Sequence, residues 1–278
     1  MRLANFLALT LGGASLLVVA CHKVPYTGRT QFNLLPDVLM MGLGKSSYAS
    51  TLSAVKVKKK GEDNVVLQRV GGRISKVADE PTFDWEYSLI NEDEVNAWCL
   101  PGGYIGFYSG ILPVLESEAG MAFVMGHEVA HATAKHGSER MSQQLTLLGG
   151  LAGLELYLSQ GTDIDPKVRG TIMGALGVAG QYGVLLPFSR AHEAEADVIG
   201  MMYMARAGYP PKEGQPLWDR MAAASGGAEP PVFMSTHPSN ERRKANLQEW
   251  LPAARKKYLR NKLQADTLSV LWPGGAHQ

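Results

Sequence analysis

The spacing of hydrophobic residues changes along the chain between the period of a helix and that of a strand. Residues 62 to 79 carry apolar side chains every three or four positions, among them Val66, Val70 and Ile74, which predicts an amphipathic helix. Residues 84 to 91 alternate between polar and apolar side chains, which predicts a strand. The helical spacing recurs over seven further segments: 38–58, 116–136, 139–158, 166–185, 189–207, 212–224 and 239–257.

Two short apolar runs, 97–100 and 104–108, flank the turn sequence Pro101-Gly102-Gly103. This pattern predicts two strands joined by a tight turn. Helices come first, then a small sheet, then many helices, and this order predicts an α+β domain over residues 38–258. We expect a mainly helical domain with a small β-sheet ahead of the helix at 116–136, followed by a C-terminal tail at 259–278.

The N-terminal segment is strongly apolar. Residues 3 to 20 carry no charge after Arg2, and the run ends in Val18-Val19-Ala20-Cys21. Such a run predicts a signal peptide over residues 1–20, with an uncleaved membrane anchor as the alternative. Its end resembles a bacterial lipobox, which implies cleavage before Cys21 and lipidation of that cysteine. Residues 21–37 would then form a lipidated, extended leader. By resemblance to the bacterial sorting rule, His22 in place of Asp favours the outer membrane.

Charge and cysteine content narrow the function. The chain has 27 lysines and arginines against 26 acids, so no strong field suggests a nucleic-acid partner. Its two cysteines are Cys21 and Cys99, and a lipid on Cys21 leaves no partner for a disulfide. Cys99 lies among apolar residues, where we expect an unreactive buried thiol. Residues 170 to 186 are uncharged but rich in glycine, and we expect a buried helix there rather than a membrane span.

The strongest chemical signal is His127-Glu128-Val129-Ala130-His131. Residues four apart share one face of a helix, so the two imidazoles can bind a single tetrahedral zinc ion. Glu128 follows one step along and can accept a proton from the attacking water without binding the metal. Two surface histidines are the alternative, but the apolar flanks make an unpaired cluster costly and favour a metal site.

Two histidines leave such a site one ligand short. Glu193 and Asp197 are also four apart, so one carboxylate can bind the metal while the other orients a ligand histidine. An exposed acidic face at the start of a helix is the alternative. His192 is a rival third ligand, and the segment alone does not decide between them.

These motifs resemble the HtpX and CAAX-prenyl-protease family of gluzincin metallopeptidases. The resemblance rests on residues 127–131 with Lys135-His136-Gly137, on Ser189-Arg190…Glu193…Asp197, on Thr236-His237-Pro238…Arg242, and on Asn96-Ala97-Trp98…Pro101-Gly102-Gly103…Gly110. The leader at 24–29 and the lipobox resemble the family's soluble, periplasmic lipoprotein branch. The matching motifs run from about residue 91 to 245, over half the chain.

The resemblance implies roles for individual residues. It makes His127, His131 and Glu193 the zinc ligands, with Glu128 as the general base. It makes Asp197 the partner of a ligand histidine.

The resemblance also implies a substrate site. Asn96 and Ala97 would lie on the edge strand that pairs with the substrate backbone. His237 would either donate a hydrogen bond to the oxyanion or fill the open position of the zinc and keep the enzyme latent. A packing role for His237 is the third possibility.

The expected function is that of a zinc-dependent endopeptidase with one Zn²⁺ per chain. It would cleave unfolded or misassembled proteins of the bacterial envelope, in the periplasm, while anchored to the outer membrane through lipid on Cys21. The first alternative is a latent chaperone or binding module for outer-membrane protein assembly. The second is an integral membrane protease that uses residues 170–186 as a span.

Overall fold

A computed structural model of the protein describes residues 21–78, 80–161, 165–167, 170–171, 173–174, 186–224, 231–237 and 241–261. The signal peptide predicted at 1–20, most of the helix predicted at 166–185 and the tail after residue 261 lie outside these ranges. The chain divides into two compact units. One combines Met1–Asp37 with His136–Ser189, and the other combines Val38–Lys135 with Arg190–Gln278. The domain boundaries at 38 and 258 stay a prediction.

The described leader in the first unit forms a hairpin. Strand β1 (Cys21–Lys23) pairs antiparallel with β2 (Thr30–Phe32). The hairpin is tied to helix α6 (His136–Gly161), because Arg29 makes two hydrogen bonds of 2.9 and 2.8 Å with the buried Glu139 carboxylate. The sequence predicted a single extended leader instead. The chain reverses because Val24 and Arg29 close a turn through a 2.9 Å backbone hydrogen bond.

The second unit contains a three-stranded sheet in the order β3-β5-β4. Strands β4 (Ala97–Leu100) and β5 (Tyr104–Tyr108) pair antiparallel and have the predicted bounds, while β3 (Glu86–Ile90) runs parallel to β5. The turn between β4 and β5 requires positive φ at two adjacent residues, 95° at Gly102 and 91° at Gly103, which glycine adopts without strain. In the order β3-β5-β4, strand β4 lies at one edge of the sheet.

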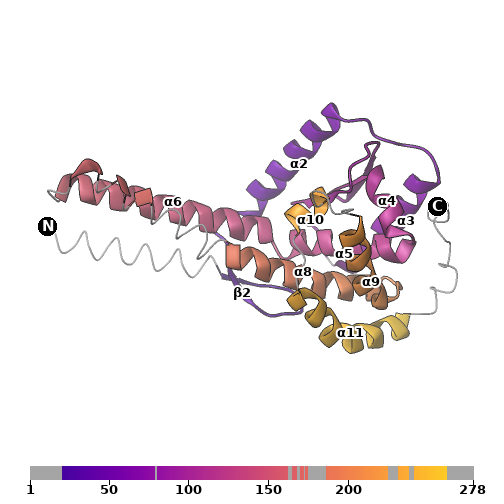
Figure 1. Ribbon diagram of the computed structural model, residues 1–278. Coiled ribbons are helices and arrows are strands. Elements are labelled where there is room, and N and C mark those ends of the chain that lie inside the picture. Colours follow the sequence, from indigo (N-terminus) through magenta and orange to yellow (C-terminus); the bar gives the residue numbers. More distant parts are fainter. Residues whose placement is uncertain are drawn as a thin grey trace. The chain divides into compact units, whose positions relative to one another are not determined.

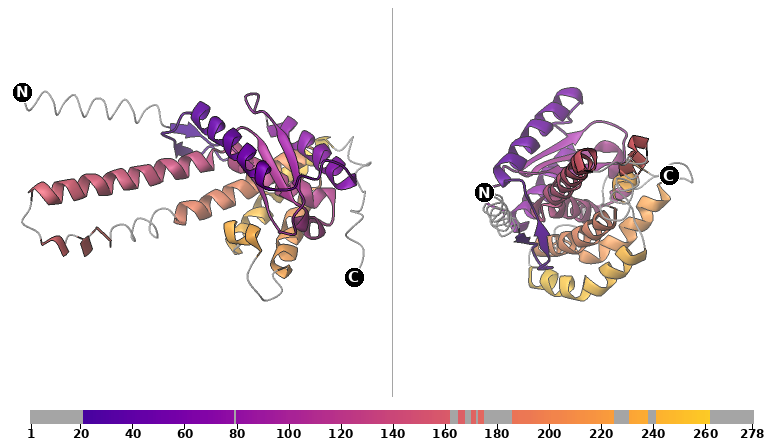
Figure 2. Two further views of the ribbon diagram at one scale, coloured as in Figure 1. Left: turned by 90° about the horizontal axis from the view of Figure 1, so that it is seen from above. Right: turned by 90° about the vertical axis from the view of Figure 1, so that its left-hand side faces the viewer.

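Helices cover both faces of this sheet (Figures 1 and 2). On one face lies α2 (Asp37–Ala54), which carries Tyr48. The centroid of the Tyr48 ring lies 5.2 Å from that of Tyr104, and the Tyr48 hydroxyl lies 2.8 Å from Ser88 Oγ. On the other lie α3 (Glu62–Ala78) and α5 (Glu118–Thr133). The protein is thus α+β and mainly helical, with the small sheet ahead of the helix that carries His127, as predicted.

Helix α5 is buried almost throughout. It begins after Ser117, whose side chain accepts a 3.1 Å hydrogen bond from Gly120 N–H. It ends at Thr133 with Ala134 as the C-cap, and Lys135 then adopts a positive φ of 53°. The prediction of 116–136 is therefore two to three residues too long at each end. A helix buried on nearly every side has no solvent to screen its charged groups, so its histidines and glutamates need hydrogen-bonding or charged partners.

The remaining helices surround α5. They are α4 (Leu112–Leu115), α8 (Leu186–Arg206), α9 (Gly214–Ala223), α10 (Val232–Thr236) and α11 (Glu241–Asn261), with 3₁₀ turns at Ser109–Ile111 and Pro211–Glu213. The short α10 was not predicted. No helix in the described part of the chain is both long and apolar enough to cross a membrane.

Helices α5 and α8 make close contact where Gly126 of α5 meets Gly200 of α8. A Cβ atom on Gly126 would lie 2.6 Å from Gly200 O, and one on Gly200 would lie 2.6 Å from His127 N. Backbone therefore meets backbone at the crossing, directly beside His127. This contact sets the distance between α5 and α8, and with it the distance between the side chains that each helix contributes to the site.

We expect Gly200→Ala to lower the free energy of unfolding by about 1–3 kcal/mol, because the added methyl group forces the two helices apart. Gly72→Ala is the matched control, since Gly72 is also helical but has no atom within 4 Å of its Cβ position. That variant should gain about 0.4–1 kcal/mol. Urea unfolding of both variants measures the difference, and a similar effect in the two would contradict a tight crossing.

Candidate metal site

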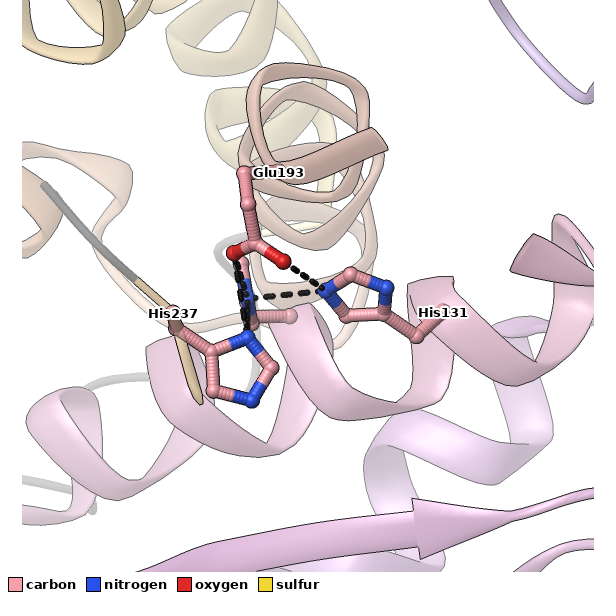
Figure 3. A group of neighbouring side chains, drawn as sticks. His131, Glu193 and His237 are labelled. Carbon is pink, nitrogen blue, oxygen red and sulfur yellow. Dashed lines mark hydrogen bonds and ion pairs between the residues drawn. The ribbon is translucent and has the colours of Figure 1, made fainter. Parts of the chain in front are cut away.

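Four side chains from three helical segments converge in the second unit. His127 and His131 come from α5, Glu193 from α8 and His237 from the C-terminal end of α10. One ligand atom from each lies within 4.8 Å of the other three. Figure 3 shows His131, Glu193 and His237 pointing toward one another. The structure therefore brings together the three predicted ligands and the predicted His237.

The distances within this cluster match those around one tetrahedral metal ion. His127 Nε2 lies 3.1 Å from His131 Nε2 and 3.2 Å from His237 Nδ1. Glu193 Oε2 lies 3.0 Å from His237 Nδ1, and its Oε1 lies 3.4 Å from His131 Nε2. Bonds of about 2.0–2.1 Å to a tetrahedral zinc ion separate neighbouring ligand atoms by about 3.3 Å. Three imidazoles and a carboxylate are also ligands that zinc prefers.

The hydrogen bonding of His127 suits a metal ligand. Its Nδ1 lies 3.0 Å from Asp197 Oδ1, so Nδ1–H donates to that carboxylate and the lone pair of Nε2 points into the cluster. Burial lowers the pKa of His127, but the carboxylates of Asp197 and Glu193 outweigh it and raise the pKa to about 9. A metal ion must displace the second proton, which the imidazolium carries on Nε2, because only the neutral imidazole binds metal; the proton on Nδ1 stays in the hydrogen bond to Asp197.

Asp197 fixes the orientation of His127 from the side of the imidazole that faces away from the cluster. It is fully buried and lies one helical turn from Glu193, on the same face of α8. Burial alone would raise the pKa of Asp197, but the Arg243 guanidinium outweighs it and the pKa falls below the ordinary value. The geometry thus separates the two carboxylates: Glu193 reaches the cluster and Asp197 the far side of the imidazole. His192 is buried but is not among the four converging residues.

Arg243 was missed by the sequence analysis, which matched Arg242 to the family motif. Arg243 is 1% exposed and binds Asp197 through Nε and a terminal nitrogen, at 2.6 and 2.7 Å. Its other terminal nitrogen lies 3.2 Å from Glu193 Oε2 and 3.1 Å from the His237 carbonyl oxygen. Helical periodicity could have predicted that Arg243 is buried, because it shares a face of α11 with the buried Leu247 and Ala254.

Glu128 lies beside the cluster without belonging to it. Its carboxylate is buried, and Oε1 lies 3.4 Å from His237 Nε2 without making a hydrogen bond. Burial raises the pKa of Glu128, whereas the neighbouring His237 and His127 lower it and a backbone hydrogen bond from Cys99 does the same. On balance the pKa of Glu128 is raised, which makes it a stronger base than an ordinary carboxylate.

The edge strand lies beside Glu128. Asn96 accepts a 3.1 Å hydrogen bond from Tyr108 N–H through its carbonyl, while Ala97 N–H donates 2.9 Å to the Asn96 side-chain oxygen. Phe233 N–H, at the start of α10, donates 3.1 Å to the Val95 carbonyl. Within the described residues, no second strand pairs with β4 on its outer side. Ala97 is therefore the first residue of the edge strand and Asn96 directly precedes it, while their role in binding substrate stays a prediction.

The two cysteines differ in what the structure describes. The thiol of Cys99 is free, and burial together with the Glu128 carboxylate raises its pKa well above the ordinary value. Such a thiol stays protonated at neutral pH, as predicted, although Cys99 is half-buried and not fully buried. The side chain of Cys21 lies outside the described residues, so its lipidation stays a prediction.

A helix with two histidines one turn apart, a carboxylate from a second helix and a glutamate beside them define a metallopeptidase. Residues 62–251 match Peptidase family M48, and the chain belongs to that family. It is a metalloendopeptidase, in agreement with the sequence analysis. The finer likeness to the HtpX and CAAX-prenyl-protease branch stays a prediction.

Known relatives cover much of the chain. The mitochondrial metalloendopeptidase OMA1 of Schizosaccharomyces pombe is 31% identical over 96% of this chain and 76% of its own length. OMA1 of Arabidopsis thaliana is 38% identical over 60% of this chain and 32% of its own. The beta-barrel assembly-enhancing protease of Escherichia coli is 28% identical over 66% of this chain and 37% of its own.

We expect Arg243→Met to lower the free energy of unfolding by about 3–5 kcal/mol, because Asp197 then stays buried without its cationic partner. Lys244→Met is the matched control: Lys244 pairs with Asp219 at the surface, and its loss should cost about 1 kcal/mol or less. Urea denaturation of both variants provides the measurement. Equal losses would show that the buried arginine contributes no more than a surface lysine.

Proposed function

We propose that the protein is a zinc-dependent endopeptidase in which His127, His131 and Glu193 hold the metal and Glu128 is the general base. The convergence of these ligand atoms at separations of 3.1–3.4 Å carries the proposal. Asp197 supports it, because a carboxylate behind His127 fixes the tautomer that a metal ligand needs.

The chemistry follows from what each side chain can do. A zinc ion at this site supplies a Lewis acid that polarises the scissile carbonyl and acidifies water. Glu128 takes a proton from the attacking water and returns it to the leaving amine, so its raised pKa suits both steps. The surrounding apolar residues of α5 exclude bulk water and strengthen these electrostatic interactions.

Substrate binding would use the sheet edge. An extended polypeptide can add to β4 through main-chain hydrogen bonds beside Asn96 and Ala97, and such binding reads few side chains. This mode favours unfolded or misassembled chains over folded ones. We propose envelope proteins of a bacterium as the substrates, with the enzyme held at the periplasmic face of the outer membrane by lipid on Cys21. The lipobox-like end of the apolar N-terminal run supports that location.

Glu128→Gln tests the assignment of the general base. The amide cannot accept the proton, so we expect casein cleavage to fall by about 10²–10⁴-fold while one equivalent of zinc remains bound. Activity and metal content are measured on the same preparation. Glu62→Gln, an exposed position in the first turn of α3, is the control and should retain both. Undiminished cleavage by Glu128→Gln would remove Glu128 from the mechanism.

The position of His237 favours a second candidate function. Its Nδ1 lies within the metal cluster, 3.0 Å from Glu193 and 3.2 Å from His127, which is where a fourth ligand would lie. Four protein ligands leave no open position for substrate, and an open position is what a catalytic metal needs. The protein would then be a latent enzyme that mainly binds outer-membrane proteins during assembly and cleaves them rarely.

His237→Ala distinguishes the two roles of this histidine. If His237 closes the site, its removal should raise the rate of casein cleavage, and this is the result we expect. If it stabilises the oxyanion, the rate should fall by about 10²–10³-fold. Thr236→Ala, an exposed neighbour on α10, is the control and should leave the rate unchanged. An unchanged rate in His237→Ala would leave the residue with a packing role only.

A further inference from the structure

Helix α6 in the first unit carries an apolar stripe that faces away from the rest of the described unit. Leu145, Leu148 and Leu156 are exposed by 50, 62 and 56%. Met141 and Ala152 complete the stripe, since all five positions follow one another at intervals of three or four residues. Leucines exposed to this extent along about three turns of one helix form a contiguous hydrophobic surface, which marks an interaction site.

The same stretch lacks the charges of a water-facing helix. Residues 141–154 contain no acidic or basic side chain. They do contain Gly149, Gly150 and Gly153, and apart from the adjoining backbone of the helix no atom lies within 4 Å of the position of a Cβ on any of them. A glycine in an exposed helix costs about 1 kcal/mol relative to alanine in water. Apolar surroundings tolerate such glycines, which are more frequent in membrane helices than in soluble ones.

The N-terminal chain indicates what covers this surface. The hairpin that begins at Cys21 is fixed to the base of α6 by Arg29 and Glu139, and Leu34 N–H donates 2.8 Å to Ser142 Oγ. Directly before Cys21 lies the uncharged run of residues 3 to 20. A segment apolar enough to enter lipid therefore ends one hairpin away from α6. This holds whether the run itself or a lipid on Cys21 enters the bilayer.

We propose that α6 docks on a lipid surface, with the stripe from Met141 to Leu156 buried at the boundary between headgroups and acyl chains. A second copy of the chain is the rival occupant, because intervals of three and four residues also suit a coiled coil. Coiled coils carry charges along both sides of their apolar seam, whereas the positions beside this stripe up to residue 154, such as Gln144 and Gly149, are uncharged, and Glu155 borders only its last turn. The uncharged flanks over residues 141–154 and the adjoining apolar run favour lipid.

A fluorescent label on the stripe tests the docking. The full-length chain with Cys21→Ser and Cys99→Ser receives an environment-sensitive dye at Leu148→Cys, so that the dye has a single thiol to react with. The protein is reconstituted with vesicles of phosphatidylethanolamine and phosphatidylglycerol. We expect blue-shifted emission and quenching by lipids brominated on their acyl chains. The matched control is Thr146→Cys, an exposed position of the same helix that lies off the stripe, and it should show neither change.

Two results would overturn the proposal. Equal emission and quenching at positions 148 and 146 would show that the stripe does not enter lipid. A blue shift at position 148 that grows with protein concentration in detergent, without vesicles, would assign the stripe to a second copy. A further variant guards against an effect of the dye itself: with the label moved to Leu156→Cys, the substitutions Leu145→Lys and Leu148→Lys should abolish the shift while circular dichroism stays unchanged.

Discussion

A buried carboxylate shared between a histidine and an arginine holds the candidate site together. Asp197 accepts from His127 on one side and from Arg243 on the other, so α5, α8 and α11 meet at one residue. Each of these side chains stabilises the buried state of the next. The arginine keeps the carboxylate ionised in an apolar interior, and the ionised carboxylate in turn fixes the histidine tautomer. The geometry of the proposed ligands is therefore built into the folded chain through three segments that are distant in sequence.

The short helix α10 joins two functions that are separate in the sequence. Phe233 N–H binds the Val95 carbonyl next to the sheet edge, and His237 four residues later reaches the metal cluster. One segment of a few residues thus lies against both the proposed substrate edge and the proposed fourth ligand position. The tilted packing of the Phe233 ring on the His237 ring, 4.7 Å between centroids, keeps the segment compact.

Local patterns in the sequence predicted the elements that local physics determines. The bounds of β4 and β5 follow from two apolar runs around a Pro-Gly-Gly turn, and His127 and His131 share a face because helices repeat every 3.6 residues. The choice of Glu193 over Asp197 as the proposed ligand needed the resemblance, since both project from the same face of α8. Only the crossing of α5 and α8 separates them, and that crossing depends on contacts far apart in sequence.

The features that were missed depend on tertiary contacts. Arg243 takes its position from the buried face of α11, and α10 is too short to show a period. The crossing of α5 and α8 has a wider consequence, because main-chain atoms of Gly126 and Gly200 set the spacing of the helices that carry His127 and Glu193. The spacing at this crossing therefore does not depend on the size of core side chains elsewhere, which can diverge without changing it. Such tolerance suits a family in which a relative spanning 96% of this chain shares only 31% of its residues.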